Sequence, residues 1–221
     1  LAMDRSPLAA AAVVVAALSS ASFRMVGPIY GQEVGLSAGQ IAWFLSAFVL
    51  GGALAQFPIG WLADKFDRRW VLIWLSAASI VSCAVTVMAA GMGTGAVFLS
   101  ATLFGLTTFP IYSVAASHAH DFAKSEERVE LSAALMFWFA VGAIFAPYLA
   151  SVLIENYGPA ALFGMISIGH GVLVIFGLTR MRARPTAKKR TPYVYAPRTT
   201  FTIGRLMRRQ RDNRSDGRKA P

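Results

Sequence analysis

Long apolar runs separated by short polar segments dominate the first 180 residues of the chain. The first run, 8–30, would rise about 34 Å as a helix, enough to cross a bilayer core of about 30 Å. Backbone donors inside hydrocarbon need partners within their own segment, so each run predicts an α-helix. The predicted spans are 8–30, 41–59, 70–90, 96–117, 129–154 and 160–178. The pattern therefore predicts an all-α integral membrane protein with six transmembrane helices in residues 1–180.

The first apolar run also has features of a signal peptide, because Arg5 precedes it and small residues follow at 19–22. A signal peptide would lead into a soluble domain, whereas further apolar runs follow here, which favours a membrane span. The chain begins with Leu1, so we expect a fragment, with Met3 as the alternative start.

Composition agrees with the pattern of apolar runs. Hydrophobic residues make up 56% of the chain and charged residues only 14%, whereas about a quarter of a soluble domain is charged. The net charge of +10 does not belong to a folded face, since residues 180–221 hold fourteen of the 21 Lys and Arg. We expect 181–221 to be a disordered cytoplasmic tail that is attracted to anionic lipids. No motif in it indicates nucleic-acid binding.

The polar connections between the runs differ in charge, which predicts the orientation. Segments 32–40, 91–95 and 155–159 contain no Lys or Arg. The other two connections contain Lys65, Arg68, Arg69, Lys124 and Arg128. Because basic residues collect on the cytoplasmic side, both termini are predicted to be cytoplasmic.

The most charged of these connections is the stretch 60–69, Gly-Trp-Leu-Ala-Asp-Lys-Phe-Asp-Arg-Arg, which we interpret as the turn between the second and third spans. A generic basic turn would explain the Lys and Arg residues of this stretch, but it would not explain the positions of Gly60 and Asp64 relative to them. The stretch resembles the signature loop of the major facilitator superfamily of secondary transporters. The residues that carry this resemblance, and the predicted conformational-switch loop, are Gly60, Asp64, Lys65, Arg68 and Arg69. The family usually has Gly in place of Asp67, so we expect a turn that is less tight or more ion-paired.

The resemblance implies a fold and a mechanism. Members have twelve helices in two halves, so this chain would be one six-helix half with a 3+3 inverted repeat that transports a small solute by alternating access. The basic tail and the abrupt start favour the C-terminal half. The implied partners are the missing N-terminal half or a second six-helix chain, an unknown small-molecule substrate, and H⁺ or another coupling ion.

Two further segments narrow the resemblance. The segments 109–113 (Phe-Pro-Ile-Tyr-Ser) and 118–121 (His-Ala-His-Asp) resemble the YcaD-like branch of bacterial facilitators. This implies a multi-pass protein of the bacterial plasma (inner) membrane.

Arg24 is the one basic residue deep inside a predicted span. An arginine at mid-membrane costs about 2.5–3.5 kcal/mol on insertion scales, so we expect a water-filled cavity or a carboxylate beside it. In one interpretation Arg24 binds an anionic substrate group or couples to an acid of the missing half. In the other it snorkels outward, towards Glu33. The sequence leaves both open.

Gln56, Tyr112 and Trp138 are polar or amphipathic side chains inside three other spans. With Arg24 they form the predicted substrate or ion cavity, although interhelical hydrogen bonds or packing would explain them as well. His170 lies in the last span, where we expect packing rather than proton relay.

The segment 118–121 has a His-x-His-Asp spacing that suggests a metal site, but no third ligand cluster supports one. A solvated cap or gate contact is the favoured interpretation, so neither a metal nor a cofactor is predicted. Nothing in the chain resembles a nucleophile–base pair or a nucleotide-binding motif, so we do not expect an enzyme. The alternative function is a six-helix membrane scaffold or interaction protein without transport activity.

Overall fold

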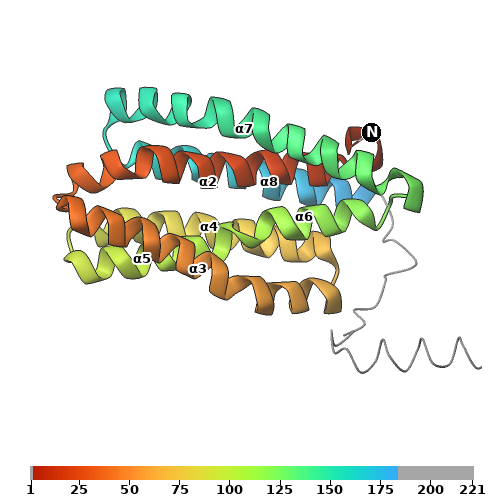
Figure 1. Ribbon diagram of the computed structural model, residues 1–221, viewed down its shortest axis with the longest axis horizontal. Coiled ribbons are helices and arrows are strands. Elements are labelled where there is room, and N and C mark those ends of the chain that lie inside the picture. The colour runs from red at the N-terminus through yellow and green to blue at the C-terminus, as the bar shows by residue number, and fades with distance from the viewer. Residues whose placement is uncertain (1, 184–221) are drawn as a thin grey trace, which may run out of the picture. The chain divides into compact units, whose positions relative to one another are not determined.

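The computed structural model describes residues 2–183, and within them every element is helical (Figure 1). The elements are α1 (Ala2–Arg5), α2 (Pro7–Glu33), α3 (Ala38–Lys65), α4 (Arg68–Ala89), α5 (Thr94–Thr108), α6 (Pro110–His120), the 3₁₀ turn η1 (Ser125–Glu127), α7 (Arg128–Tyr157) and α8 (Ala161–Ala183). Six segments of this part of the chain are long and apolar enough to cross a membrane, with α5 and α6 forming one of them and η1 and α7 another. For residues 2–183, the prediction of an all-α fold with six helices able to span a membrane is confirmed. Residues 181–183 of the predicted tail continue α8, and the rest of that tail lies outside the described residues.

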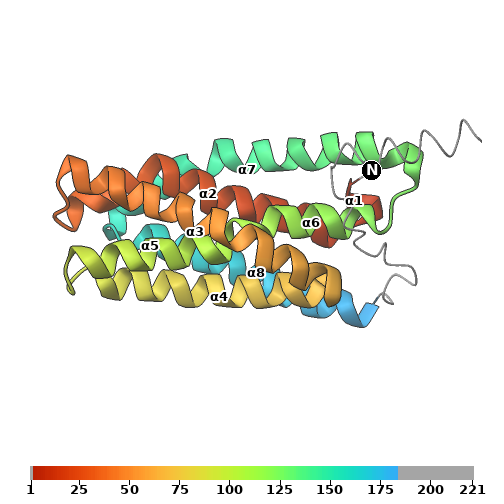
Figure 2. The ribbon, with the colours of Figure 1, turned by 60° about the horizontal axis from the view of Figure 1, so that its bottom comes forward.

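The helices run alternately up and down, so that α2, α4 and α7 begin at the end of the bundle where α3, α6 and α8 finish (Figures 1 and 2). We call this end the basic end, because it carries Lys65, Arg68, Arg69, Lys124 and Arg128. The turn that joins α4 to α5 and the turn that joins α7 to α8 lie at the opposite end.

The stretch 60–69 is mostly helix, which corrects its interpretation as a ten-residue turn. Gly60 to Lys65 continue α3, and α4 already begins at Arg68, so only two residues connect the helices. The helix keeps its hydrogen bonds past the apolar run, as the 2.8 Å bond from Phe66 N–H to the Leu62 carbonyl shows. Polar side chains do not end a helix where it leaves the hydrocarbon, because its backbone groups stay paired internally.

The span formed by α5 and α6 is interrupted at Phe109 and Pro110. Proline lacks a backbone N–H and crowds the preceding turn, which removes a helical hydrogen bond there, while Phe109 keeps helical backbone angles. The Phe109 ring then packs against Gly52 of α3, where a Cβ atom would lie 2.3 Å from the ring. Glycine at position 52 is therefore required for Phe109 to lie where it does.

Close backbone approaches hold the helices together. In the pair α3–α5, a Cβ atom added to Gly105 would lie 1.9 Å from the Phe48 carbonyl oxygen, and one added to Gly51 would lie 2.1 Å from the Thr102 oxygen. In the pair α2–α7, a Cβ atom at Gly142 would lie 2.9 Å from the Val14 oxygen. Small residues at helix contacts are typical of membrane proteins, where close packing replaces the hydrophobic effect between helices.

An aromatic cluster fills the bundle interior towards the end opposite the basic one. Phe23 of α2 lies at its centre, with ring centroids 4.3 Å from Phe48 and 4.9 Å from Phe44 of α3, 5.2 Å from Phe104 of α5 and 6.2 Å from Phe163 of α8. All five side chains are buried. The cluster therefore joins four helices in one apolar core.

Large apolar side chains also lie exposed on the outer faces of α3 and α7. They include Trp43, Leu54 and Phe57 on α3 and Phe137, Phe145 and Tyr148 on α7. Exposed apolar surface of this extent is unsuited to water but suits lipid or a further helix.

A polar contact, Ser19 with His170, joins α2 to α8 in the interior. The Ser19 hydroxyl lies 2.9 Å from the Val15 carbonyl oxygen and 2.9 Å from His170 Nε2. If the hydroxyl donates to Val15, it accepts from His170 Nε2–H, and Nδ1 finds no partner in the described chain. Both side chains are fully buried.

Ser19→Ala is expected to lower the free energy of unfolding by about 1 kcal/mol, because it removes the hydrogen-bond partner of His170 Nε2 and leaves this buried ring nitrogen unpaired. SDS titration of the purified protein measures this change. Ser46→Ala is the matched control, because Ser46 makes the same bond to the backbone four residues earlier but is exposed. An equal effect of the two substitutions would contradict a role for the contact between Ser19 and His170.

Candidate functional site

A cavity of about 500 Å³ lies between α2, α3, the α5–α6 span and α7. Its walls are mainly apolar, with one charged side chain and several hydroxyl or amide groups. The lining residues are Ala16, Ser20, Arg24, Gln56, Thr108, Phe109, Tyr112, Ser113, Met136, Phe139 and Ala140.

The polar groups of this cavity come from three spans, α2, α3 and the α5–α6 span. Arg24 of α2 donates from Nε to the Ser20 carbonyl oxygen at 3.1 Å. The Ser113 hydroxyl of α6 lies 3.3 Å from the side-chain oxygen of Gln56 of α3. The Tyr112 ring stands edge-on to Phe139 of α7, with centroids 5.4 Å apart. The cavity thus presents a guanidinium, an amide and hydroxyls beside aromatic surface.

Three of the four predicted cavity residues line this space: Arg24, Gln56 and Tyr112. Trp138 does not. It is half-buried on α7 and packs against the apolar core at the basic end, while its neighbour Phe139 faces the cavity. A role of any of these residues in binding stays a prediction.

Sequence reasoning missed most of the cavity lining, including Ser20, Phe109 and Ser113. A signal for them exists. The lining residues of α2 are spaced four apart, Phe139 and Ala140 follow Met136 of α7 by three and four, and Phe109 precedes Tyr112 by three. These are the spacings of one helix face. Extending such a face from Arg24 and from Tyr112 would have found Ser20 and Phe109.

Arg24 also borders a second cavity, of about 600 Å³, with residues of α3 that include Leu45, Ser46 and Val49. Beyond the bond to Ser20, the described chain offers its guanidinium no hydrogen-bond or ion-pair partner. In particular, Arg24 and Glu33 form no ion pair with each other in that part of the chain. Arg24 is exposed to the two cavities rather than packed.

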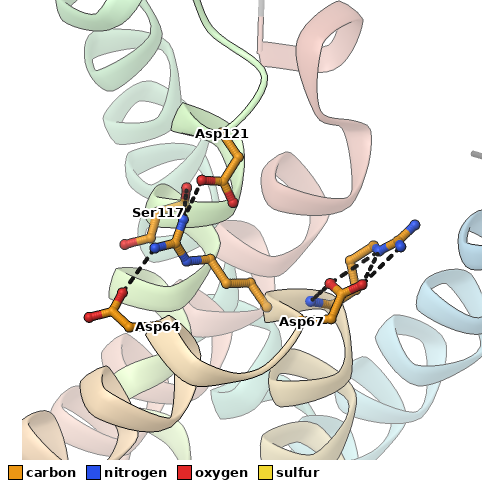
Figure 3. Close-up of polar contacts among 6 residues, drawn as sticks. Asp64, Asp67, Ser117 and Asp121 are labelled. Carbon is orange, nitrogen blue, oxygen red and sulfur yellow. Dashed lines mark hydrogen bonds and ion pairs between the residues drawn. The ribbon is translucent and has the colours of Figure 1, made fainter. Parts of the chain in front are cut away.

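An ion network at the basic end joins α3, α4 and α6 (Figure 3). Arg68, the first residue of α4, donates from Nη2 to Asp64 Oδ1 of α3 at 3.0 Å. Its Nη1 donates to Asp121 Oδ1 at the end of α6 and to the Ser117 carbonyl oxygen at 3.2 Å. The Arg68 and Asp121 side chains are only 13% and 10% exposed, so water screens this pair weakly.

Asp67 and Arg69 form a separate ion pair (Figure 3). Asp67 caps α4, because its carboxylate accepts from Arg69 N–H at 3.0 Å and from Arg69 Nη2 at 2.9 Å. A carboxylate is favourable at the positive N-terminal end of a helix. Of the two expectations for Asp67, the connection has the ion-paired form.

Gly60 and Lys65, the remaining residues of the predicted switch loop, take no part in these ion pairs. A Cβ atom at Gly60 would meet nothing within 4 Å, so Gly60 does not serve a close helix approach inside this bundle. Lys65 lies over the Trp61 ring, with Nζ 4.8 Å from its centroid. The structure therefore brings Asp64 and Arg68 together and leaves Gly60 and Lys65 on an open face of α3.

The polar side chains of segment 118–121 contact different residues. Asp121 binds Arg68, His120 Nε2 lies 3.2 Å from the Ser132 hydroxyl of α7, and the buried His118 ring packs against Phe122. Within residues 2–183 no three His, Cys, Asp or Glu side chains gather closely enough to hold a metal ion. The loop pattern alone gave no sign that Asp121 completes the network around Arg68.

The bundle is that of a multi-pass membrane protein, and comparison with known proteins identifies its family. The family model described as Major Facilitator Superfamily matches residues 9–212. The chain therefore belongs to the major facilitator superfamily. This superfamily consists of transporters and not of enzymes, which confirms that expectation.

Curated relatives support the narrower resemblance. The chain is 28% identical over 167 residues to the uncharacterized MFS-type transporter YE1530 of Yersinia enterocolitica, covering 75% of this chain and 41% of that protein. It is 31% identical over 143 residues to the uncharacterized MFS-type transporter YcaD of Salmonella paratyphi B, covering 63% of this chain and 35% of that protein. The distant similarity to YcaD-like transporters is confirmed, and the chain spans about two fifths of the length of these relatives.

Solved structures show the same fold. The POT family transporter PepTSo superposes with a TM-score of 0.72 at 20% identity, over 91% of this chain and 41% of that one. An auto-inhibited POT family peptide transporter gives a TM-score of 0.66 at 17% identity, over 89% of this chain and 43% of that one. The six helices therefore have the fold of half a facilitator.

Proposed function

We propose that the chain is one six-helix half of a secondary transporter, which moves a small solute across the bacterial plasma membrane by alternating access. The cavity around Arg24, Gln56 and Tyr112 carries this proposal, because it places polar groups from three helices inside the membrane-spanning part of the bundle. Since the chain spans about 41% of a relative, the remaining cavity wall would come from an N-terminal half or a second six-helix chain.

The orientation follows from the basic end. Lys65, Arg68, Arg69, Lys124 and Arg128 all belong to it, and α2 begins and α8 finishes there. By the positive-inside rule this end is cytoplasmic, with both termini. The basic tail favours the C-terminal half and would lie against anionic lipids.

The helix packing supports a 3+3 inverted repeat. If the first three spans (α2, α3, α4) correspond to the last three (α5–α6, α7, α8), the contact of α2 with α7 corresponds to the contact of α5 with α3. These two pairs are the most extensive in the bundle. Both contain a glycine at the close approach on the corresponding helices, Gly142 of α7 in one and Gly51 of α3 in the other.

The network around Arg68 would act as a brace during transport. It holds the ends of α3 and α6 to the start of α4, so these helices would move together as one unit. Gly60 and Lys65, on the open face of α3, would contact the second half in one of the two conformations. A break in that contact would accompany opening to the cytoplasm. H⁺ or another ion would couple the cycle to a gradient.

Cysteine labelling tests alternating access directly. The chain has one cysteine, Cys83, which is buried, so Cys83→Ala with Ser113→Cys leaves one thiol in this chain, at the cavity. In the protein that carries this chain, membrane-impermeant maleimide applied from either side is expected to label position 113. Conditions that favour one conformation should then raise labelling from one side at the expense of the other.

The control for this labelling is Ser79→Cys in the same background, because Ser79 is fully buried in the packing of α4 and should stay unlabelled. Labelling of position 113 from one side alone, under every condition, would support the membrane scaffold instead.

A further inference from the structure

The lining of the cavity carries a positive charge and no negative one. Among its lining residues Arg24 is the one charged side chain, and no carboxylate accompanies it. Neither Asp64 of α3 nor Asp121 at the end of α6 lines the cavity, and both bind Arg68 at the basic end. The described bundle thus holds a cation inside its spans without an internal counter-ion for it.

The guanidinium is oriented for an incoming anion. Its Nε donates to the Ser20 carbonyl oxygen at 3.1 Å, which anchors one edge of the planar group to α2. The two terminal nitrogens have no hydrogen-bond partner within residues 2–183, and Arg24 is exposed to the cavity. Two parallel N–H donors are the geometry that a carboxylate or a similar oxyanion binds in a bidentate manner.

The aromatic part of the cavity lining suits an apolar body. Tyr112 and Phe139 form an edge-to-face pair with centroids 5.4 Å apart, and Phe109 and Met136 extend this surface. Phe109 is held in place by the contact of its ring with Gly52. Aromatic and thioether groups of this kind favour flat or flexible apolar ligands.

We propose that the substrate is an organic anion, with an oxyanion bound by Arg24 and an apolar or aromatic body against Phe109, Tyr112 and Phe139. The Gln56 amide and the Ser113 hydroxyl are placed to bind further polar groups of the ligand. This inference rests on the proposed transport function and names the substrate class of the same cavity. A cation of the same shape is disfavoured, because Arg24 repels it.

Probes that differ only in charge test the inference. The protein that carries this chain, in lipid nanodiscs, is titrated calorimetrically with benzoate, benzamide and benzylammonium, and with hexanoate and hexanamide as an aliphatic pair. The acids are expected to bind at least about tenfold more tightly than their amides, which corresponds to about 1.4 kcal/mol. Benzylammonium is expected to bind most weakly.

Variants then assign the preference to Arg24. Arg24→Gln should abolish the difference between acid and amide, and Arg24→Lys should retain part of it. Lys124→Gln is the matched control, because it removes one positive charge from an exposed position outside the cavity and should leave the preference intact. The probe series on the unmodified protein needs no variant, so it stands even if Arg24→Gln folds poorly.

Equal binding of acids and amides, failure of both acids to bind, or an acid preference that survives Arg24→Gln would each overturn the inference. A carboxylate of the second half paired with Arg24 would produce such a result. The labelling at position 113 needs no anion, so a transporter of neutral solutes would pass that test and fail this one.

Discussion

Gly105→Ala is expected to lower the free energy of unfolding by about 3 kcal/mol or more, and to prevent normal packing of α3 against α5. The added methyl group would lie 1.9 Å from the Phe48 carbonyl oxygen, and backbone atoms cannot move aside as a flexible side chain can. The midpoint of SDS-induced unfolding, together with the yield of monodisperse protein, measures the effect.

Two other glycines calibrate this result. Gly142→Ala should be milder, because its methyl group would lie 2.9 Å from the Val14 oxygen. Gly171→Ala in α8 is the matched control, since nothing lies within 4 Å of its Cβ position. This control should be neutral or stabilising by up to about 1 kcal/mol, the helix-propensity difference between the two residues. A result for Gly105→Ala equal to that of the control would contradict the close backbone contact between α3 and α5.

Arg68→Gln is expected to destabilise the bundle by about 2–3 kcal/mol. The substitution leaves Asp64 and Asp121 charged and close together without their shared cation, and the Asp121 side chain is only 10% exposed. The same unfolding titration measures the loss. Arg182→Gln, an exposed arginine in the last turn of α8, is the control and should change stability by less than about 0.5 kcal/mol.

A double-mutant cycle separates the network from a general effect of charge. Combining Arg68→Gln with Asp121→Asn removes the carboxylate that the first substitution leaves unpaired. The double variant should therefore lose less stability than the sum of the two single variants. Strict additivity would show that Arg68 and Asp121 do not interact.

The membrane spans could be predicted from local pattern, because hydrocarbon allows a single solution for an apolar segment of twenty residues. The ends of the spans could not. Helix α3 continues six residues past the predicted end at Ile59, since its backbone bonds do not depend on apolar side chains. The signature residues of 60–69 were found by their resemblance, but the pairing of Arg68 with Asp121 joins positions 53 apart in the chain.

The cavity shows the same division. Arg24, Gln56 and Tyr112 stand out as polar groups within apolar runs, and the structure places them around one space. Trp138 is equally conspicuous in the sequence, yet the next residue of α7, Phe139, lines the cavity in its place. Which side chain lines a space depends on the rotation of each helix about its axis, and the sequence pattern does not reveal it when apolar residues surround the whole helix.

The sequence by itself determined that the chain has six segments able to span a membrane, which family it resembles and which end of the bundle is basic. These properties depend on hydrophobic length, on local motif spacing and on charge counts. The tertiary structure alone decided that the signature stretch is a two-residue connection between helices, that Arg68 bridges two carboxylates, and that Arg24 lies uncompensated beside an aromatic wall. Those properties depend on helix rotation and on backbone approaches at Gly52, Gly105 and Gly142, which arise only when distant segments pack together.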